Sequence, residues 1–419
     1  MERSGKFVEF QVPEQVTKIC RILSEHGEDG YLVGGSLRDL LLGNVPDDWD
    51  LATTATPDKM LRMFHRVIPT GIDHGTVTVL MDREGFEVTT LRSEKGYSDG
   101  RHPDSVKFVT GIEEDLSRRD FTVNAIAWNP LTREIFDPFD GESDLRKRRL
   151  VAVGNAETRF TEDGLRIMRA ARFAATLEFE IEPDTADAIP RTAHRLKNVS
   201  VERKRDEFIK LMQAVRPSRG LRLLLQNNVF EYVCPNAGEC RPDSDWDQTL
   251  AFVDSVPPDL HLRLVAFWAG IDPRTVSNWL ERFLIDRRTR KQVLHLLQFF
   301  PVSPGKSCSD GTLRKYISEV GKEAVPDLLV LLDAYPAQNA HAGDSGNWLR
   351  ERLATVDWSS WPLAVGELAV SGADLISELG ISPGPKIGAI LKMLLDSVLE
   401  HPEDNKADVL LSLARKKFL

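Results

Sequence analysis

A glycine pair and two carboxylates stand close together near the start of the chain, in LVGGSLRDLLLGNVPDDWD. Gly34 and Gly35 have no Cβ, so their amides can approach an anion, and the helix expected after them offers unpaired N–H groups to phosphate. Arg38 adds a planar cationic donor. If Asp48 and Asp50 lie on a strand, their carboxylates point to the same side and can share a metal site. Each half alone also fits an ordinary turn or an acidic loop, but together they suit nucleotidyl transfer with two Mg²⁺ ions, one for an attacking 3′-hydroxyl and one for a triphosphate.

A pair of adjacent arginines precedes an aspartate in SRRDFTVNA, residues 117–125. Burying Arg118 and Arg119 without an anion would be costly, so a triphosphate is a natural partner. Asn124 could hold a ribose or brace the site. Because exposed Arg-Arg pairs are common, this segment supports the chemistry only together with the first one.

The segment FTEDGLRIMRAARF, residues 160–173, predicts a single helix. Thr161 is the expected N-cap, and two acidic residues follow in the first turn, where the helix dipole favours them. Three arginines then follow at steps of three, and the charges sweep about half of the helix circumference. An acid-capped helix with solvated arginines is therefore an alternative to a binding site. The charged residues concerned are Glu162, Asp163, Arg166, Arg169 and Arg172.

Asp163 and Arg166 are expected one helical turn apart, and this pair matches two of the four bases. Cytosine and adenine each present an amino donor beside a ring-nitrogen acceptor, whereas uracil and guanine present a carbonyl beside a ring N–H. A carboxylate that accepts and a guanidinium that donates fit the first arrangement and oppose the second. The two residues could therefore act as a protein template that selects C and A.

The elements that must position these residues fall into two parts. Up to about residue 140 the pattern predicts mixed helix and strand, and beyond about residue 155 it predicts long helices with no convincing strand. The first part holds a helix over 14–26, strands over 31–33, 76–81, 86–91 and 106–109, and a turn over 82–85. Pro-rich breaks at 256–258 and 301–304 indicate boundaries inside the helical part. The predicted fold class is α+β, with a mixed head followed by an all-helical remainder.

Length and composition describe a globular protein of two to four domains, with 419 residues of which 42% are hydrophobic and 28% charged. No run of about eighteen apolar residues predicts a membrane span, and the N-terminal MERSGKFVEFQVPEQ lacks the apolar core of a signal peptide. The four cysteines lack zinc-ligand spacing, which favours reduced thiols in a cytoplasmic protein. The net charge is −10, yet residues 141–220 hold 17 Lys and Arg against 13 Asp and Glu, so a basic middle permits RNA binding.

With these segments in place, the sequence resembles the bacterial CCA-adding enzymes, in the class II tRNA nucleotidyltransferase family that also contains bacterial poly(A) polymerases. The likeness covers nearly the whole chain. It runs through GGSLRDLLLG with DWD, GTVTVLMDREGFEVTTLR, RRDFTVNAIA, DPFDG, EDGLRIMRAARF and SVERKRDEFIKLM to GELAVSGADLISELGISPGPKIG. The resemblance implies a catalytic polymerase-β-type nucleotidyltransferase head over 1–145, a helical neck with the base-recognition helix over 146–215, a helical body over 216–305 and a helical, tRNA-binding tail over 306–419.

The same resemblance implies site residues and ligands. Asp48 and Asp50 would bind Mg²⁺ as the catalytic pair, and Glu87, on the FEVTTLR strand, is the candidate for a third metal carboxylate. Asp163 and Arg166 would select the base. The implied reaction adds CMP, CMP and AMP from CTP and ATP to the 3′ end of tRNA and releases pyrophosphate, with no membrane and no obligate protein partner. The nucleotide contacts would be Gly35, Arg38, Arg119, Asp163, Arg166, Arg169 and Arg172.

Four functions are compatible with these features. Beside full CCA addition, the family contains enzymes restricted to CC or to A alone, and poly(A) polymerases. Poly(A) polymerases typically carry a GRRF-like basic segment after the metal strand, where this chain has VIPTGIDHG. A non-catalytic RNA-binding protein is the fourth function, and the intact Asp48, Asp50, Arg119 and Asp163 argue against it.

Two further segments complete the predictions. Arg92–Lys107, RSEKGYSDGRHPDSVK, is rich in Gly, Ser and Asp and predicts a mobile loop. In enzymes of this family that add only CC, the corresponding loop is shortened. Ser382–Gly388, SPGPKIG, is either a tight helix connection or a turn whose amides bind an RNA phosphate. By the same resemblance, body and tail grip the tRNA by its shape.

Overall fold

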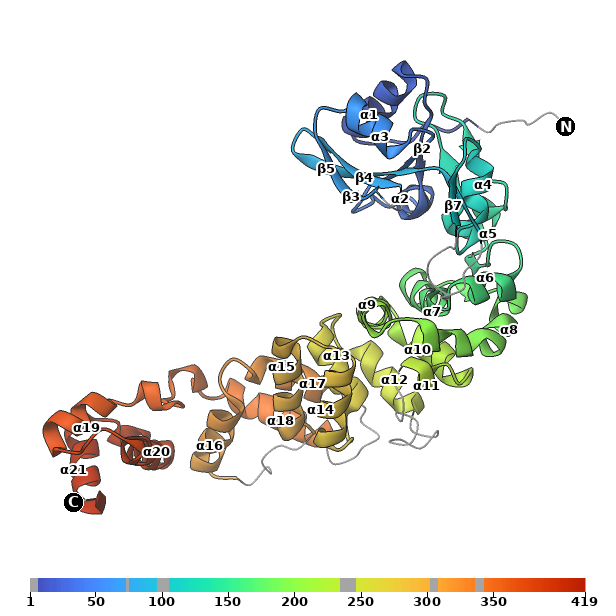
Figure 1. Cartoon of the computed structure of the whole chain (residues 1–419). Helices are drawn as coiled ribbons and strands as arrows, with labels where there is room; N and C mark the ends of the chain where they lie inside the picture. Colours follow the sequence, from blue (N-terminus) through green and yellow to red (C-terminus); the bar gives the residue numbers. More distant parts are fainter. Residues whose placement is uncertain are drawn as a thin grey trace. The chain divides into compact units, whose positions relative to one another are not determined.

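The computed structural model describes residues 7–72, 75–95, 105–233, 246–301, 308–335 and 343–418. The chain divides into two compact units, residues 1–238 and residues 239–419. The first unit contains a β-sheet, blue in Figure 1, and the green helices that follow it along the chain. In its described part the second unit consists of helices and their connections. The predicted α+β class is therefore confirmed.

A seven-stranded mixed sheet forms the framework of the first unit, in the order β3-β4-β5-β2-β1-β8-β9. Its neighbouring strands are antiparallel except β2 and β5, which run parallel with Asp50 opposite Glu87. Side chains of residues directly opposite each other lie on the same face of a sheet, so this register brings two carboxylates to one side. The strands are β1 (Gly30–Val33), β2 (Asp50–Thr53), β3 (Val67–Gly71), β4 (Thr76–Met81), β5 (Glu84–Thr90), β8 (Ala127–Trp128) and β9 (Ile135–Phe136).

The hairpin of β4 and β5 follows the predicted alternation, with the valines of both strands buried. Its turn is tighter than the predicted turn over 82–85, because β5 already begins at Glu84. Asp82 and Arg83 alone connect the strands, and both have a positive φ. Two left-handed residues in a hairpin loop match the twist of the flanking strands.

A hydrophobic cluster fixes the end of β1, where the glycine pair begins. Tyr31 and Val33 of β1 pack with Ala52 of β2 and with Ile112 and Leu116 of α4 (Ile112–Ser117). The apolar face of α1 (Glu14–Glu25), which confirms the helix predicted over 14–26, is buried as well. Helix α2 (Gly34–Leu41) therefore starts from a rigid strand end.

The helix predicted over residues 160–173 is two helices, so that prediction is wrong. Helix α6 ends at Glu162, and α7 begins at Leu165. Asp163 lies between them in an extended conformation. Thr161 is in the last turn of α6 rather than at an N-cap. The two helices are α6 (Ala156–Glu162) and α7 (Leu165–Leu177).

Gly164, directly after the break, lies close to the backbone of η3 (Ala193–Asn198). A Cβ on Gly164 would lie 2.8 Å from the carbonyl carbon of Arg195. The junction of the two helices therefore packs too tightly against η3 to admit a side chain at this position.

Further elements of the first unit include a short strand where the sequence predicted only helices. Strand β11 (Glu180–Ile181) pairs in parallel with β10 (Arg149–Leu150). The segment predicted as a loop over 92–107 is a β-hairpin at both ends, formed by β6 (Arg92–Lys95) and β7 (Ser105–Phe108). The middle of that segment, 96–104, lies outside the described residues. Further helices are α3 (Pro57–Met63), α5 (Gly141–Arg146), α8 (Pro183–Thr192), α9 (Val201–Met212), α10 (Pro217–Gln226) and α11 (Phe230–Val233).

The second unit confirms the predicted Pro-rich breaks, which fall between α12 and α13 and after α15. Near its C-terminal end, the predicted 382–388 segment is only in part a helix connection, because α20 already begins at Pro385. Ile381 and Ile390, on either side of the segment, are buried in one apolar cluster. Binding of RNA phosphate there stays a prediction. The helices are α12 (Trp246–Ser255), α13 (Leu260–Trp268), α14 (Pro273–Arg282), α15 (Arg287–Phe299), α16 (Asp310–Val320), α17 (Val325–Ala334), α18 (Gly343–Ala354), α19 (Gly372–Leu379), α20 (Pro385–Glu400) and α21 (Ala407–Phe418).

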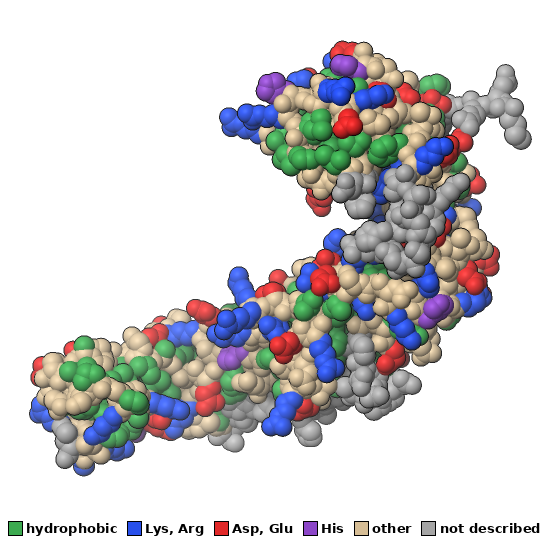
Figure 2. All heavy atoms as spheres, viewed as in Figure 1, with side chains coloured by type: hydrophobic (Ala, Val, Ile, Leu, Met, Phe, Trp, Pro, Cys, Tyr) green, Lys and Arg blue, Asp and Glu red, His purple; other side chains and the backbone are tan. Residues whose placement is uncertain are grey.

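On the face drawn in Figure 2, Lys and Arg side chains are interspersed with Asp and Glu. No helix in the described part of the chain combines the length and the apolar composition that crossing a bilayer requires.

Candidate active site

A cavity of about 690 Å³ in the first unit gathers nearly all of the predicted site residues. Nine Lys and Arg and five Asp and Glu line it, so its walls carry an excess of positive charge that suits a triphosphate. The charged residues of the lining are Arg38, Asp48, Asp50, Glu87, Arg92, Arg118, Arg119, Asp120, Asp163, Arg166, Arg169, Arg172, Arg203 and Lys210.

The turn from β1 into α2 brings a backbone corner to the carboxylate of the next strand. Gly34 has a φ of +69°, and a Cβ there would lie 3.4 Å from an Asp50 carboxylate oxygen and 3.3 Å from an Arg119 nitrogen. A left-handed residue in so narrow a space favours glycine. The Ser36 hydroxyl donates to the carbonyl of Val33 at 2.9 Å and accepts from the Asp50 amide at 3.3 Å. This hydroxyl therefore ties the start of β2 to the glycine turn.

The two predicted metal carboxylates line the cavity, but they are not both on a strand. Strand β2 begins at Asp50, and Asp48 lies in the bend before it, so the predicted strand geometry holds for one of the two. Burial raises the pKa of Asp50, and so does the neighbouring carboxylate of Glu87, whereas Arg119 lowers it. A bound cation would offset the repulsion between the carboxylates of Asp50 and Glu87 and would favour the charged form of Asp50.

These carboxylates fit a hard divalent cation, which prefers oxygen ligands and offsets their repulsion. Asp48 and Asp50 are the residues that would hold it. Among the described residues, no three acidic, histidine or cysteine side chains form a ready-made metal cluster. A ligand role for Glu87 therefore stays a prediction.

The two adjacent arginines share one buried counterion that the sequence did not single out. Asp115 of α4 is only 1% exposed; it accepts from Arg118 at 2.7 Å through one oxygen and from Arg119 at 3.1 Å through the other. Burial raises the pKa of Asp115, but the two guanidinium groups lower it more, so it lies below its usual value. The same carboxylate also accepts from the amide of Arg92, at the base of the β6–β7 hairpin, at 3.2 Å.

Asp120 and Asn124 brace the cavity from behind. The Asn124 side chain accepts from Arg38 at 2.9 Å and donates to Asp120 at 3.1 Å. Asp120 also pairs with Arg169, at 2.6 Å. Burial raises the pKa of Asp120, yet Arg169 and these hydrogen bonds bring it down to about 2. Of the two predicted roles for Asn124, the geometry favours the brace.

Two arginines of α7 and one of α2 lie around one aromatic ring. Arg38, Arg169 and Arg172 have their guanidinium carbons 5.3, 5.3 and 4.0 Å from the centre of Phe173. Arg172 also donates to Glu207 of α9 at 2.6 Å. Contacts of this kind hold flexible cations in place without removing their charge. The predicted alternative of solvated arginines does not describe these two residues of α7, whose side chains are 34% and 14% exposed.

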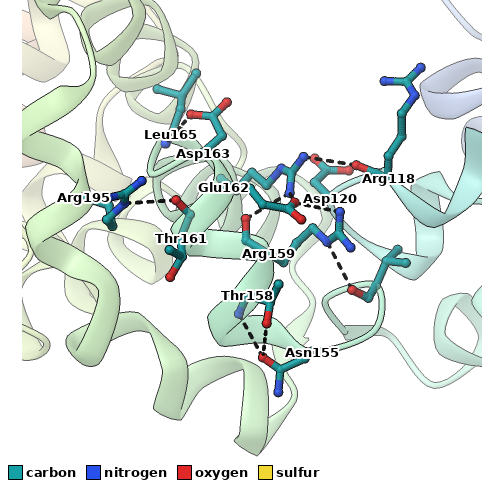
Figure 3. A network of polar contacts seen from close by, with 12 residues as sticks. Arg118, Asp120, Asn155, Thr158, Arg159, Thr161, Glu162, Asp163, Leu165 and Arg195 are labelled. Atoms are coloured by element: carbon teal, nitrogen blue, oxygen red, sulfur yellow. Dashed lines mark hydrogen bonds and ion pairs between the residues drawn. The ribbon is translucent and has the colours of Figure 1, made fainter. Parts of the chain in front are cut away.

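Asp163 and Arg166 both line the cavity, but they are not paired with each other. The Arg166 guanidinium is buried and donates to Glu162 at 2.6 Å and to the carbonyls of Arg159 and Arg118 at 2.9 and 3.1 Å. Asp163 instead accepts from the amide of Leu165 at 3.0 Å. Figure 3 shows this junction, with Glu162 and Arg159 on one side and Asp163 on the other.

Helix α9 contributes two cavity residues, Arg203 and Lys210, and a buried carboxylate behind the cavity, Glu207, to which the sequence analysis gave no role. Arg203 pairs with Asp163 at 2.7 Å, Glu207 pairs with Arg172, and Lys210 is exposed at the rim. Their spacing of four and three residues places them on one face of a helix, and that spacing in SVERKRDEFIKLM is the signal that could have found them.

Three family profiles match the chain in order. The poly(A) polymerase head domain covers residues 30–151, and the RNA and SrmB-binding site of polymerase A covers 178–240. Domain 2 of tRNA nucleotidyltransferases covers 261–414. The mixed sheet, the glycine turn and the paired carboxylates, together with the head-domain match, define the class of the protein as a nucleotidyltransferase.

Similar proteins of known family narrow the class from nucleotidyltransferases in general to one family among them. The chain is 35% identical over 417 residues to the CCA-adding enzyme of Lactococcus lactis subsp. lactis, covering 97% of this chain and 98% of the relative. It is 37% identical over 399 residues to that of Lactobacillus delbrueckii subsp. bulgaricus, covering 94% and 96%. The crystal structure of the Bacillus stearothermophilus CCA-adding enzyme in complex with CTP superimposes with a TM-score of 0.79, at 31% identity over 97% of this chain and 98% of that one.

The chain belongs to the family of the CCA-adding enzymes. It is a tRNA nucleotidyltransferase with tRNA and nucleotide substrates, and enzymes of this class use divalent metal ions. The predicted family, fold and enzyme class are thereby confirmed.

Proposed function

We propose that the cavity of the first unit takes CTP and then ATP, and that the chain adds C, C and A in turn to the 3′ end of tRNA. One observation carries this proposal: metal-type carboxylates, triphosphate-type arginines and the predicted base-selecting residues all line a single cavity. A nucleotide can therefore be bound by its phosphates and read by its base in one place.

Asp48 and Asp50 are proposed to hold Mg²⁺, which when bound supplies Lewis-acid activation of the attacking 3′-hydroxyl and of the phosphates. The glycine turn and the N-terminus of α2 present amides toward the phosphates. Arg119 already stands against the glycine turn, so it can meet the same phosphates without moving far. The further nucleotide contacts proposed are Gly35, Arg38, Arg169 and Arg172.

Base selection is proposed for Asp163 and Arg166. A carboxylate accepts from the amino group that cytosine and adenine share, and a guanidinium donates to the adjacent ring nitrogen. Arg166 uses three of its five N–H groups on Glu162 and on two carbonyls, which leaves two N–H groups for a base. Its burial and its three contacts hold it in one orientation, as a template requires.

The remaining parts are proposed to serve the RNA. The four-part division into head, neck, body and tail stays a proposal, in which the helices after the head bind tRNA by its shape. The match of residues 178–240 to an RNA-binding region of polymerase A supports this assignment for the end of the first unit. No obligate protein partner is proposed.

One experiment tests the proposed product. Purified protein is supplied with Mg²⁺, CTP and ATP and with tRNAs that end at the discriminator base, at C or at CC, and the products are sequenced. Full CCA on all three substrates supports the proposal. A product that stalls at CC would make the protein a CC-adding enzyme, whereas extension of the CC substrate alone would make it an A-adding enzyme.

A further inference from the structure

Arg203 of α9 holds the carboxylate that is proposed to read the base. Its two terminal nitrogens lie 2.7 and 3.4 Å from the two oxygens of Asp163. Both side chains line the cavity, and they are 25% and 14% exposed. No other cavity arginine pairs with Asp163 among the described residues.

The other ion pairs of the cavity arginines use carboxylates that either lie outside the cavity lining or are almost fully buried. Arg38 and Arg166 pair with Asp39 and Glu162, which do not line the cavity. Arg119, Arg169 and Arg172 pair with Asp115, Asp120 and Glu207. Those three carboxylates are at most 6% exposed, so a nucleotide has little access to them. The carboxylate of the Arg203 pair, by contrast, is itself placed to contact the ligand.

The hydrogen bonds of Asp163 leave room for a base. Oδ1 accepts from the Leu165 amide at 3.0 Å and from Arg203 at 3.4 Å, whereas Oδ2 accepts from Arg203 alone, at 2.7 Å. Because each carboxylate oxygen can accept more than one hydrogen bond, an amino group can be added at Oδ2 without breaking the ion pair. The Leu165 amide and Arg203 together hold the carboxylate in one orientation.

We propose that Arg203 is a positioning residue for base selection, which acts by holding the carboxylate of Asp163 in the orientation that meets the amino group of C or A. This inference rests on the proposed role of Asp163. It has a second consequence at the same place: uracil and guanine present a carbonyl where Asp163 expects an amino group. If Asp163 is removed, the released guanidinium of Arg203 can donate to that carbonyl.

The test compares Arg203→Ala and Arg203→Lys with the wild type in single-nucleotide extension of tRNA ending at the discriminator base. The measured quantity is the ratio of kcat/KM for CTP to that for UTP. We expect Arg203→Ala to lower this ratio by about tenfold, the size of one wrong-base contact, and Arg203→Lys to restore part of it because a cation remains. Arg205→Ala is the matched control, since Arg205 lies on the same helix and pairs with Asp206 away from the cavity lining. It should leave the ratio unchanged.

If Arg203 had only a structural role, its loss would lower kcat/KM for CTP and for UTP by the same factor. An unchanged ratio in Arg203→Ala, with or without a lower rate, therefore overturns the proposal. If Arg203→Ala does not fold, the ratio in Arg203→Lys decides instead: a ratio below that of the wild type supports the proposal, and a wild-type ratio overturns it.

Asp163→Ala and the double variant Asp163→Ala/Arg203→Ala separate the proposed role of Asp163 from that of Arg203. Asp163→Ala should raise use of UTP, and the double variant should lose that gain because the donor is gone. If Asp163→Ala leaves the ratio unchanged, the proposed base-reading role of Asp163 fails. If Asp163→Ala changes the ratio while removal of Arg203 does not in either background, the inference about Arg203 fails alone.

Discussion

Carboxylates that are buried or partly buried hold the arginines at the end of α4 and those of α7. Asp115 pairs with Arg118 and Arg119, Glu162 with Arg166, Asp120 with Arg169, and Glu207 with both Arg169 and Arg172. Fixed cations of this kind need little reorganisation when an anion arrives. At the scale of residues, the guanidinium groups are therefore already held in place for the phosphates that the proposed function requires.

Asp48→Ala and Asp50→Ala should each abolish incorporation of CMP and of AMP while tRNA binding survives, because the bound ions serve the chemistry. Extension assays with CTP or ATP measure the first effect, and a filter-binding assay with tRNA measures the second. Asp47→Ala is the control, since Asp47 is an exposed neighbour that does not line the cavity. A variant at 48 or 50 that retained more than a few per cent of the wild-type rate would remove that residue from the metal site.

Asp120 predicts a specific acid dependence of stability. Its pKa is about 2 in the folded chain and about 4 in an unfolded one. A depressed pKa adds stability above the unfolded value, and this contribution is lost as the pH falls from about 4 to about 2. The amount is about 2–3 kcal/mol for a buried group.

The free energy of unfolding of Asp120→Asn should therefore fall less steeply than that of the wild type across this range, and it should be lower at neutral pH because Arg169 loses its counterion. Urea titrations at several pH values measure both. Asp206→Asn removes an exposed carboxylate and should leave the slope near that of the wild type. Parallel pH curves for Asp120→Asn and the wild type would contradict the assignment.

At the scale of elements, the junction of α6 and α7 shows where sequence reasoning reached its limit. The periodicity of the segment is helical on both sides of Asp163, and both helices exist. The break between them lies at Asp163, next to the close packing of Gly164 against η3, about thirty residues further along the chain. No local pattern reports such long-range packing. The extended conformation of Asp163 and its pairing with Arg203 could therefore not be predicted.

Other elements were predictable because their signal is local. The alternation of β4 and β5 and the positions of α1 and β1 followed from periodicity, and the motif order identified the residues that line the cavity. Short pairings such as β10 with β11 carry two residues each and have almost no periodicity to read. The buried counterion Asp115 was missed because a lone aspartate in an acidic helix start resembles an ordinary dipole contact.

Gly164→Ala should destabilise the α6–α7 junction, because the added methyl group would meet the backbone of Arg195 rather than a movable side chain. The free energy of unfolding should fall by about 1–3 kcal/mol, and CMP incorporation should fall as Asp163 shifts. Urea titration and extension assays measure the two effects. Gly111→Ala is the matched control, where the nearest atom is a carboxylate oxygen of Glu114 at 3.7 Å. Equal stability of the two variants would show that the junction tolerates the methyl group.

The pairing of β6 with β7 indicates how much of the loop between them can be deleted without disturbing the two strands. The last paired residues are Lys95 and Ser105, so deleting 96–101 leaves three residues between them, a length that a hairpin accepts. The described pairing should therefore survive. We expect CMP addition to remain nearly intact and the terminal AMP to be lost, as in relatives with a shortened loop.

Sequencing of products from tRNA ending at the discriminator base measures this outcome. A variant in which 96–101 is replaced by six Gly and Ser residues separates length from sequence. Addition of the terminal A by the deletion variant would show that the loop has no part in the change from C to A.

At the scale of the whole molecule, the net charge is negative, but two parts of the chain carry an excess of positive charge. The chain carries 64 Asp and Glu against 54 Lys and Arg, yet the cavity lining and the 141–220 segment are both positive. Long-range attraction for RNA is therefore weak, and binding depends on local phosphate contacts. An acidic remainder would repel RNA that is not held at those contacts.

Affinity for tRNA should accordingly fall steeply with salt. Between about 50 and about 200 mM KCl the Kd should rise at least about tenfold, because each phosphate contact releases a counterion. Fluorescence anisotropy with labelled tRNA measures the slope. Lys210→Ala should make the slope shallower if this exposed cavity cation meets the RNA, whereas Lys18→Ala, on α1 and outside the cavity lining, should not. A Kd independent of salt would mean that binding does not rest on phosphates.

If the two nucleotides bind in one cavity, as proposed above, a kinetic consequence follows. Two triphosphates that occupy the same space exclude each other, so ATP becomes a competitive inhibitor during the first two additions and CTP becomes one during the third. The speed of each step then depends on the ratio of the two pools rather than on either concentration alone. A cell short of pyrimidines would therefore slow the maturation of its tRNA ends twice over, once through the missing substrate and once through the competitor that takes its place.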